Sequence, residues 1–425
     1  MNLEEEARRR SREGQWLARM RTRQLSIQAA GSITVQQAPP REGTVVRMVE
    51  GGVQREWAVP GWHDWLTPQT TTEEFRWLGR TPVAHVPLAD KIARARDLQA
   101  RMAGRDPRLA QAVVLYEERL EDRRITTADF DRIGEVSRIL FGVMVMVHDR
   151  GRSEQGLVFA GRVGGFEVTE LAESDLDAVV ENAVRMLEAA SIEPGRYRVV
   201  TSPEVSGVLA HEAFGHGVEM DLFLSHRAKA QESIGHRVGS GFATIIDDPT
   251  LPGGYGGYPF DDDGNLAAPH TILDRGTLVG GLADADVAAA LRASGGNGRR
   301  QDYSRKVYPR MSNTFFASGT ETPEALIAGV EEGVYLRRVE SGMEDPKNWG
   351  MQITIHSGEE IRDGRLTGRL YRTMAMTGFV PDVLTSIDGA ASDFAMWPGM
   401  CGKGHKEWCT NGTGGPHLRM TARLG

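Results

Sequence analysis

The stretch PGRYRVVTSPEVSGVLAHEAFGHGVEMD, residues 194–221, decides how the second half of the chain is built. Its first ten residues are rich in Val, Tyr and Thr and are bounded by Pro and Gly, which predicts a strand over 194–203. The strand leads directly into a predicted helix that carries His211, Glu212 and His216. This helix is the first candidate for a functional site.

The two histidines are close to the zinc-binding pattern H-E-x-x-H, but they lie one residue too far apart. In that pattern, residues i and i+4 share one helix face and bind the same ion, while the glutamate holds the attacking water. His211 and His216 stand at i and i+5, so an ideal helix separates them by about 140°. A π-bulge or a locally unwound turn would bring the imidazoles together, and Gly215 and Gly217 tolerate such a distortion. The sequence therefore predicts a metal site at a distorted helix end.

The third metal ligand is left open by the spacing. A catalytic zinc ion needs at least a third protein ligand and one open position for water. A thiolate is a strong zinc ligand, and glycines border Cys401 in PGMCGKGHKEWC, residues 398–409. The nearby and distant candidates are Glu219, Asp221, His226, His236, Cys401, His405 and Cys409.

Composition limits the class of protein. The 425 residues suffice for two domains, and a formal net charge of −8 gives no sign of a polyanion-binding protein, so we expect no nucleic-acid partner. The sequence has no apolar run of about 18 residues, and its charged N-terminal segment has no apolar h-region, so we expect no membrane span and no secretion. Its two cysteines do not make a disulfide framework, which favours the cytoplasm.

The patterns along the chain predict an α+β fold with two domains. Residues 1–192 are expected to form an N-terminal α/β domain with an antiparallel meander, and residues 193–425 a β-rich catalytic domain that carries the H-E-x-x-x-H helix. In the second domain, short apolar runs between turn residues predict hairpins, with one helix near 321–334. The elements expected in the first domain are a polar helix over 4–27, strands over 44–50 and 53–59 around Gly51-Gly52, a helix over 87–104, strands over 112–121, 138–149 and 155–163, and a helix over 174–191 with Ser174 as its N-cap.

Several separated motifs resemble the TldD/PmbA family of zinc metallopeptidases. The motif helix lies within SPEVSGVLAHEAFGHGVEMD, residues 202–221. The segments DDPTLPGGYGGYPFDDDG (247–264), GNGRRQDYSRKVYPRMSNTFF (296–316) and GMCGKGH (399–405) follow in the order of the family. The resemblance covers nearly all of residues 160–420 and is far more specific than the histidine pair alone.

The resemblance implies a zinc ion held by His211, His216 and Cys401, with Glu212 as the general base. In the family, TldD-like chains keep H-E-x-x-x-H and TldE-like (PmbA) chains lack it. The two form a heterodimer that degrades unfolded peptides and trims the leader from a peptide antibiotic precursor. This chain keeps the motif and resembles the active subunit, so we expect a TldE-like partner or, alternatively, a homodimer. A strand-rich cleft further favours a peptide substrate in extended form, paired with a sheet edge.

Hydrolysis also needs a group that stabilises the oxyanion formed from the scissile carbonyl. Arg299, Arg300 and Tyr303 in GNGRRQDY are the candidates, and His405 is a further candidate for contact with the substrate. The alternative for the first three residues is a structural turn whose arginines pair with acids elsewhere.

The segment after Cys401 supports two other functions. Where the family usually continues CGK-x-G-Q, this chain has CGKGHKEWC, which adds His405, Trp408 and Cys409 beside the site. This change motivates a dedicated tailoring hydrolase that acts on one biosynthetic peptide or small amide. A non-catalytic subunit with a structural metal is the other alternative. The four ligands of such a closed site would be His211, His216, Cys401 and Cys409.

Simpler interpretations remain for the same residues. The two histidines of the motif are alternatively satisfied core residues, and Cys-x3-His-x3-Cys around His405 is itself able to hold a metal. A disulfide between Cys401 and Cys409 is disfavoured by the compartment. Asp247, Asp248 and the run 261–263 lack the rest of a calcium-binding loop, so we expect a solvated acidic turn there.

Overall fold

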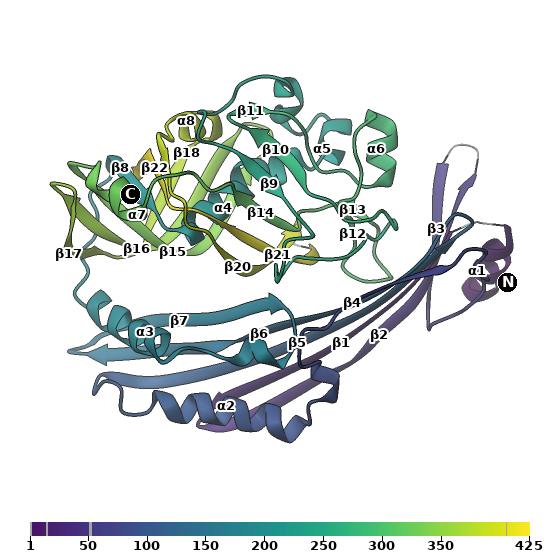
Figure 1. Cartoon of the computed structure of the whole chain (residues 1–425), viewed down its shortest axis with the longest axis horizontal. Helices are drawn as coiled ribbons and strands as arrows, with labels where there is room; N and C mark the ends of the chain where they lie inside the picture. Colours follow the sequence, from purple (N-terminus) through teal and green to yellow (C-terminus); the bar gives the residue numbers. More distant parts are fainter. Residues whose placement is uncertain (1, 14–15, 51–52, 405) are drawn as a thin grey trace.

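The N-terminal half of the chain is built on one long, mostly antiparallel sheet (Figure 1). The computed structural model describes residues 2–13, 16–50, 53–404 and 406–425. The strand order is β3-β2-β1-β5-β6-β4, with β7 paired to β6, and only β4 runs parallel to its neighbour. The strands are β1 (Trp16–Ala30), β2 (Ser32–Glu50), β3 (Val53–Pro60), β4 (Thr72–Trp77), β5 (Leu109–Thr127), β6 (Asp131–Asp149) and β7 (Arg152–Val163).

Helices α2 (Leu88–Met102) and α3 (Glu173–Met186) pack their apolar residues into the core of this sheet. In Figure 1, α2 lies on one side of the sheet and the C-terminal half of the chain on the other. The short helix α1 (Leu3–Glu13) packs near β2 and β3. The predicted helix over 87–104, the hairpin around Gly51-Gly52 and the meander are confirmed, although these two glycines lie outside the described residues. Two short 3-10 helices, η1 (Val83–His85) and η2 (Phe166–Thr169), complete this half.

Two details of the N-terminal half were predicted wrongly. The polar helix expected over 4–27 stops at Glu13, and the residues from Trp16 onward form strand β1. Leu25, Ile27 and Ala29 are buried with the period of a strand, and β1 pairs with β2 on one side and β5 on the other. These pairings outweigh the helix propensity of the polar residues. Helix α3 begins one residue before Ser174, so that serine lies in the first turn and is not the N-cap.

The C-terminal half contains two larger sheets, and helix α4 (Pro203–Phe214) packs between them. The first sheet has the order β15-β8-β22-β18-β16-β17, with β15 also paired to β16 and β19 to β22. Its strands are β8 (Gly195–Thr201), β15 (Glu332–Asp345), β16 (Gly350–Arg362), β17 (Arg365–Tyr371), β18 (Met374–Phe379), β19 (Gly389–Ala390) and β22 (Leu418–Leu424).

The second sheet of this half has the order β11-β10-β9-β14-β21-β20. Its strands are β9 (Ile245–Asp247), β10 (His270–Asp274), β11 (Thr277–Leu278), β14 (Asn313–Phe316), β20 (Ala395–Lys403) and β21 (Lys406–Gly415), and a separate pair is formed by β12 (Gly298–Arg299) and β13 (Tyr308–Pro309). The remaining helices are α5 (Asp221–Leu224), α6 (Ala285–Leu291), α7 (Pro323–Ala328), α8 (Val380–Thr385), η3 (His216–Val218) and η4 (Lys229–Ser233). The fold is α+β, as predicted.

The predicted helix near 321–334 is shorter than expected. Helix α7 ends at Ala328, and β15 begins at Glu332. Val334 lies in the core and pairs in parallel with β8, so strand pairing takes over the residues that the helical pattern had included.

Strand β8 leads directly into α4, as the sequence predicts. The hydroxyl of Ser202 caps the helix by accepting from the amide of Val205, and Pro203 occupies the first turn. The helix passes very close to β21, because a Cβ added to Gly207 would lie 2.6 Å from the Cα of Gly414. A glycine at this position therefore sets how near the motif helix lies to the hairpin of β20 and β21.

The acidic segment 261–263 is not the solvated turn that the sequence suggested. Asp261 and Asp262 are fully buried. Asp261 accepts hydrogen bonds from the amides of Asp263, Asn265 and Gly298. Buried carboxylates need such donors, so this segment organises the surrounding loops from inside the protein.

The two largest apolar clusters lie in different parts of the chain. One extends from Leu25 to Leu187 and the other from Val199 to Leu424. The division into domains of 1–192 and 193–425 remains our proposal, and it falls between these clusters. Among the described residues, no helix combines the length and the apolar character needed to cross a membrane.

Candidate metal centre

Three side chains from distant parts of the sequence meet at the end of α4. His211 belongs to α4, His216 to η3 and Cys401 to β20. One possible ligand atom from each lies within 4.8 Å of the other two. The Sγ atom of Cys401 is 3.0 Å from Nε2 of His216, and the two imidazole centroids are 5.0 Å apart. The fold thus brings together the three residues to which the family resemblance pointed.

The helix ends between the two histidines, and this end explains their unusual spacing. The last helical hydrogen bond runs from the amide of Gly215 to the carbonyl oxygen of His211, at 2.9 Å. The chain then tightens into η3, which begins at His216. The distortion is therefore an unwound turn rather than a π-bulge. Glycine is required at 215 for space, because an added Cβ would collide with Met311.

The chemistry of these donors fits a bound metal ion. The Nδ1 atom of His211 is buried and has no hydrogen-bond partner among the described residues. Burial opposes ionisation of Cys401, but the two imidazoles hold the pKa of its thiol well below the ordinary value. Two imidazole nitrogens and a thiolate are ligands that zinc prefers. Among the described residues the group has only these three members.

A buried shell of charged residues surrounds the cluster. Glu219 accepts hydrogen bonds from Nε of Arg310 at 3.0 Å and from Nζ of Lys403 at 2.9 Å. One of its oxygens is also 3.5 Å from Nδ1 of His216. Nη2 of Arg310 lies 3.0 Å from Sγ of Cys401. Burial raises the pKa of Glu219, but the two cations outweigh this effect and lower it. The carboxylate thus orients one imidazole while Arg310 faces the thiolate.

Glu212 and Glu344 are two further acids beside the cluster. Glu212 is buried but is not a member of the three-residue group, so it is available for a role other than metal binding. It lies against β15, because a Cβ added to Gly342 would be 2.6 Å from its Cγ. Glu344 lies against Gly217, and its Oε1 has no hydrogen-bond partner among the described residues. Burial raises the pKa of Glu344 well above the ordinary value.

The two arginines expected to stabilise the oxyanion make hydrogen bonds to residues outside the metal cluster. Nη1 of Arg299 donates to the carbonyl oxygens of Met311 and Thr410. Arg300 donates to Glu56 of the N-terminal half. No hydrogen bond or ion pair within the described part of the chain joins either arginine to the metal cluster. Arg300 thus pairs with an acid, as the alternative expectation had it, whereas Arg299 binds the oxygens of Met311 and Thr410.

Of the other two candidates for substrate contact, only Tyr303 is among the described residues. The ring of Tyr303 lies against Gly43, a residue of the N-terminal sheet. His405 lies outside the described residues, so its expected role stays a prediction.

None of the other third-ligand candidates among the described residues belongs to the three-residue group. Asp221 accepts a hydrogen bond from Lys403, and His226 and His236 are exposed. Cys409 pairs with Cys401 across the β20–β21 hairpin but does not belong to the three-residue group. Both cysteines are free, in agreement with the expectation that they form no disulfide.

Sequence reasoning did not single out Arg310, Lys403 or Glu344. Arg310 lies inside the segment 296–316 and Lys403 directly follows the Cys-Gly pair, so both stand within recognised motifs. Their contacts with Glu219 depend on the meeting of three chain segments. A search for charged residues inside the motifs would have found them as candidates, but not as partners.

Comparisons with known proteins match most of the chain to one family. Residues 194–423 match the model of the PmbA/TldA metallopeptidase C-terminal domain. Residues 81–190 match the model of the central domain of the same metallopeptidases. The first match alone spans more than half of the chain and contains all three candidate ligands.

Relatives with assigned names are metalloproteases. A metalloprotease of Methanocaldococcus jannaschii is 29% identical over 336 residues, which cover 78% of this chain and 73% of the relative. A metalloprotease TldD homolog of Haemophilus influenzae is 28% identical, over 78% of this chain and 69% of the relative. A zinc metalloprotease TldD homolog of Saccharolobus solfataricus is 29% identical, over 58% of this chain and 56% of the relative. These names imply a metal in the family.

Solved structures share the fold over the whole chain. A putative modulator of DNA gyrase from Thermotoga maritima superposes with a TM-score of 0.81 at 16% identity, covering 100% of this chain and 99% of the other. TldE from Thermococcus kodakarensis superposes with a TM-score of 0.73 at 15% identity, with the same coverage. At such identities the likeness shows the fold.

The contrast between the two cysteines gives a test of the ligand set. We expect about one zinc per chain in the wild type and in Cys409→Ser, and loss of zinc in Cys401→Ser, because only Cys401 lies with the two histidines. Elemental analysis of the purified proteins measures this. Zinc retained without Cys401, or lost without Cys409, would contradict the assignment.

The orienting role of Glu219 gives a second test. Glu219→Gln is expected to weaken zinc affinity about 10–100-fold, because it removes the charge beside His216 and leaves Arg310 less compensated. Competition with a chelator measures the affinity. Asp221→Asn is the matched control, because Asp221 binds Lys403 but not His216. Equal weakening in both variants would show that the effect comes from Lys403 alone.

Proposed function

The chain belongs to the PmbA/TldA metallopeptidase family, and from this premise we propose that it is a zinc-dependent peptidase that hydrolyses peptide bonds in unfolded or extended peptides. The observation that carries the proposal is that ligand atoms of His211, His216 and Cys401 lie within 4.8 Å of one another. Glu212 directly follows His211 in α4. A relative named as a zinc metalloprotease supports zinc as the metal.

The proposed ligands and base have separate roles. His211, His216 and Cys401 would hold the zinc ion. When bound, zinc supplies a Lewis acid for the scissile carbonyl and lowers the pKa of water towards about 7. Glu212 accepts the proton of the attacking water and delivers it to the leaving amine. Its buried position against Gly342 restricts the carboxylate to a small space beside the ligands.

The second edge of β15, which pairs with no described strand beyond Leu336, supports a substrate in extended form. Strand β15 pairs with β8 only from Gly333 to Leu336, whereas its pairing with β16 continues to Asp345. Beyond Leu336, no strand of the described chain pairs with the second edge of β15. This segment passes Glu212 at Gly342. A peptide that adds a strand here would present its backbone to the site with little demand on its side chains.

A partner chain belongs to the proposal. We propose a heterodimer with a TldE-like (PmbA) subunit, with a homodimer as the alternative. The structural likeness to TldE of Thermococcus kodakarensis supports a common subunit fold for such a pair.

A dedicated tailoring hydrolase is the second candidate function. Met400 and Trp408 on the β20–β21 hairpin are exposed large apolar residues close to Cys401 in the chain. Such residues suit recognition of one particular peptide. Cleavage of many unrelated unfolded peptides would favour the general peptidase over this alternative. The non-catalytic alternative with four ligands has no support from the position of Cys409.

Replacement of the proposed base tests the mechanism. Glu212→Gln is expected to keep the bound zinc and to lower kcat about 10²–10⁴-fold, because it removes the proton acceptor without touching a ligand. Peptide hydrolysis and zinc content are measured on the same preparation. A variant with full activity would remove Glu212 from the mechanism.

The contact between Glu212 and β15 gives a further test. Gly342→Ala is expected to lower the hydrolysis rate with zinc retained, because the new Cβ would lie 2.6 Å from the Cγ of Glu212 and displace it. Gly350→Ala is the matched control, because its nearest neighbouring atom, the Cβ of Asp345, is 3.9 Å from the added Cβ. Unchanged hydrolysis in Gly342→Ala would show that the base tolerates this displacement.

A further inference from the structure

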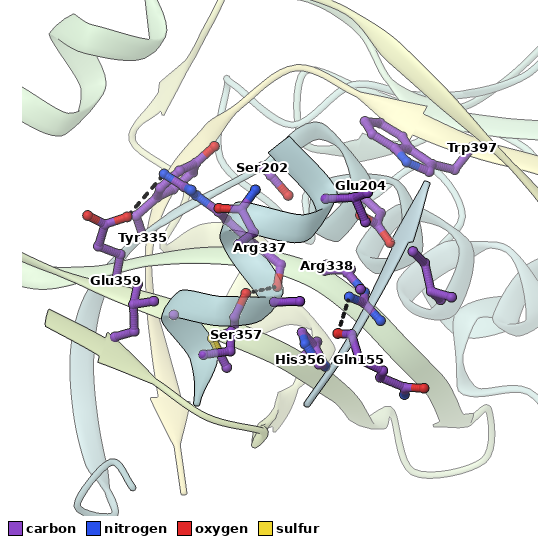
Figure 2. Close-up of a pocket in the computed structure, with 18 of the residues that line it drawn as sticks. Gln155, Ser202, Glu204, Tyr335, Arg337, Arg338, His356, Ser357, Glu359 and Trp397 are labelled. Atoms are coloured by element: carbon purple, nitrogen blue, oxygen red, sulfur yellow. Dashed lines mark hydrogen bonds and ion pairs between the residues drawn. The ribbon is translucent and has the colours of Figure 1, made fainter. Parts of the chain in front are cut away.

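A cavity of about 350 Å³ lies between the N-terminal sheet and the C-terminal half (Figure 2). Its apolar wall comes from β7 and α3, with Leu157, Val179 and Met186. The opposite wall is polar and comes from the start of α4 and from β15 and β16. None of the residues described for the metal centre lines this cavity, so it is a separate feature of the molecule.

Two elements run from this cavity to the metal centre. Helix α4 lines the cavity at Glu204 and reaches Glu212 eight residues later, a rise of about 12 Å. Strand β20 lines the cavity at Trp397 and reaches Cys401 four residues later, a distance of about 13 Å. Along both elements the cavity therefore lies about 12–13 Å from the candidate metal site, a distance that about four residues of an extended peptide would span.

Strand β15 makes the same connection with its second edge. It lines the cavity at Arg338 and reaches Gly342, beside Glu212, four residues later. Its register is interrupted between Val339 and Ser341, at the point where β8 has ended. An extended peptide bound along this edge, with its scissile bond at Glu212, would therefore extend to the cavity.

Arg338 has the features of a residue held for binding. Its φ of 59° lies in the left-handed region, which residues other than glycine rarely adopt. Its guanidinium donates one hydrogen bond, from Nη1 to the carbonyl oxygen of Gln155 at 3.2 Å, which Figure 2 shows as a dashed line. Among the described residues, no carboxylate lies within ion-pair distance of it. The neighbouring Arg337, by contrast, pairs with Glu359 at 3.2 Å.

Glu204, Glu340 and Glu154 lie close enough to Arg338 to favour its charged form, and the first two have other hydrogen-bond partners. An oxygen of Glu204 accepts a hydrogen bond from the amide of Val339 at 3.1 Å. Glu340 accepts one from His356 at 3.0 Å. Arg338 is half-buried, and this burial lowers the pKa of its guanidinium. The cavity thus contains a partly desolvated guanidinium with most of its donors unused.

We propose that this cavity is a remote substrate subsite in which Arg338 binds a carboxylate of the peptide, about four residues from the scissile bond. The carboxylate is either the free C-terminus or the side chain of Asp or Glu, and the apolar wall receives a neighbouring side chain. The proposal rests on the proposed function, because it takes the ligand to be an extended peptide on β15.

The test uses labelled peptides and the zinc-loaded Glu212→Gln variant, so that binding is measured without cleavage. One peptide has a free C-terminal carboxylate, one is amidated, and two amidated peptides carry an internal Glu or Gln about four residues from the cleaved bond. We expect a carboxylate in either place to tighten binding about tenfold or more, as a hydrogen-bonded ion pair does. If the peptide with the free C-terminus binds more tightly than the amidated peptide with the internal Glu, Arg338 binds the C-terminal carboxylate. The reverse order of affinities shows that it binds the side chain.

Substitution of Arg338 assigns the effect. Arg338→Gln is expected to remove the preference for the carboxylate, and Arg338→Lys to keep part of it. In the otherwise unchanged protein, Arg338→Gln should raise KM for the preferred peptide about tenfold with kcat within about twofold. Arg292→Gln is the matched control, because Arg292 is also left-handed, with a φ of 54°, but lies at the end of α6 away from the cavity.

The outcomes separate the two proposals. Equal affinity for acid and amide peptides, or a preference that survives Arg338→Gln, would overturn the subsite. If the wild type then still hydrolyses peptides, the proposed function stands without it. If the wild type hydrolyses no peptide but binds carboxylates through Arg338, the subsite stands and the proposed function fails.

Discussion

The buried guanidinium of Arg310 is the group on which the candidate metal centre depends. It donates to Glu219 after η3, to the carbonyl oxygen of Cys401 on β20 and to that of Glu407 on β21. An arginine charge is costly to bury without complete compensation, so these segments are held in one arrangement around it. The separation of His216 and Cys401 is therefore set by this cation as much as by the helix that carries the motif.

Local patterns were sufficient for much of the fold but for only part of the site. The helix over 87–104 and the strands of the meander follow from residues close together in the sequence. Strand β1 was missed because its pairing with β2 and β5 is not visible in its own polar sequence. The buried state of Asp261 was missed because its donors come partly from Gly298, far along the chain. Spacing predicted the distorted helix end, whereas Cys401 required the family resemblance, since no local pattern connects residues 185 positions apart.

Three glycines, which have no side chain, allow neighbouring segments to pack closely around α4. Gly207 brings the helix against β21, Gly215 makes room for Met311, and Gly342 lets β15 pass beside Glu212. At each position an added Cβ would meet an atom of a neighbouring element. Because interiors are packed as densely as organic crystals, such positions leave the helix little freedom to shift. Other residues of the motif helix, β15 and β20 line the cavity at Arg338, so the same three elements reach both places.

The origin of Cys401 in β20 has a consequence for the synthesis of the protein. The chain is made from its N-terminus, so both histidines and most strands of both sheets of the C-terminal half exist before this cysteine does. A ribosome-bound chain therefore contains an incomplete set of donors until the last hairpin has been added. The candidate metal centre is therefore complete only after one of the last strands has been made, when the rest of the molecule is already there to fold.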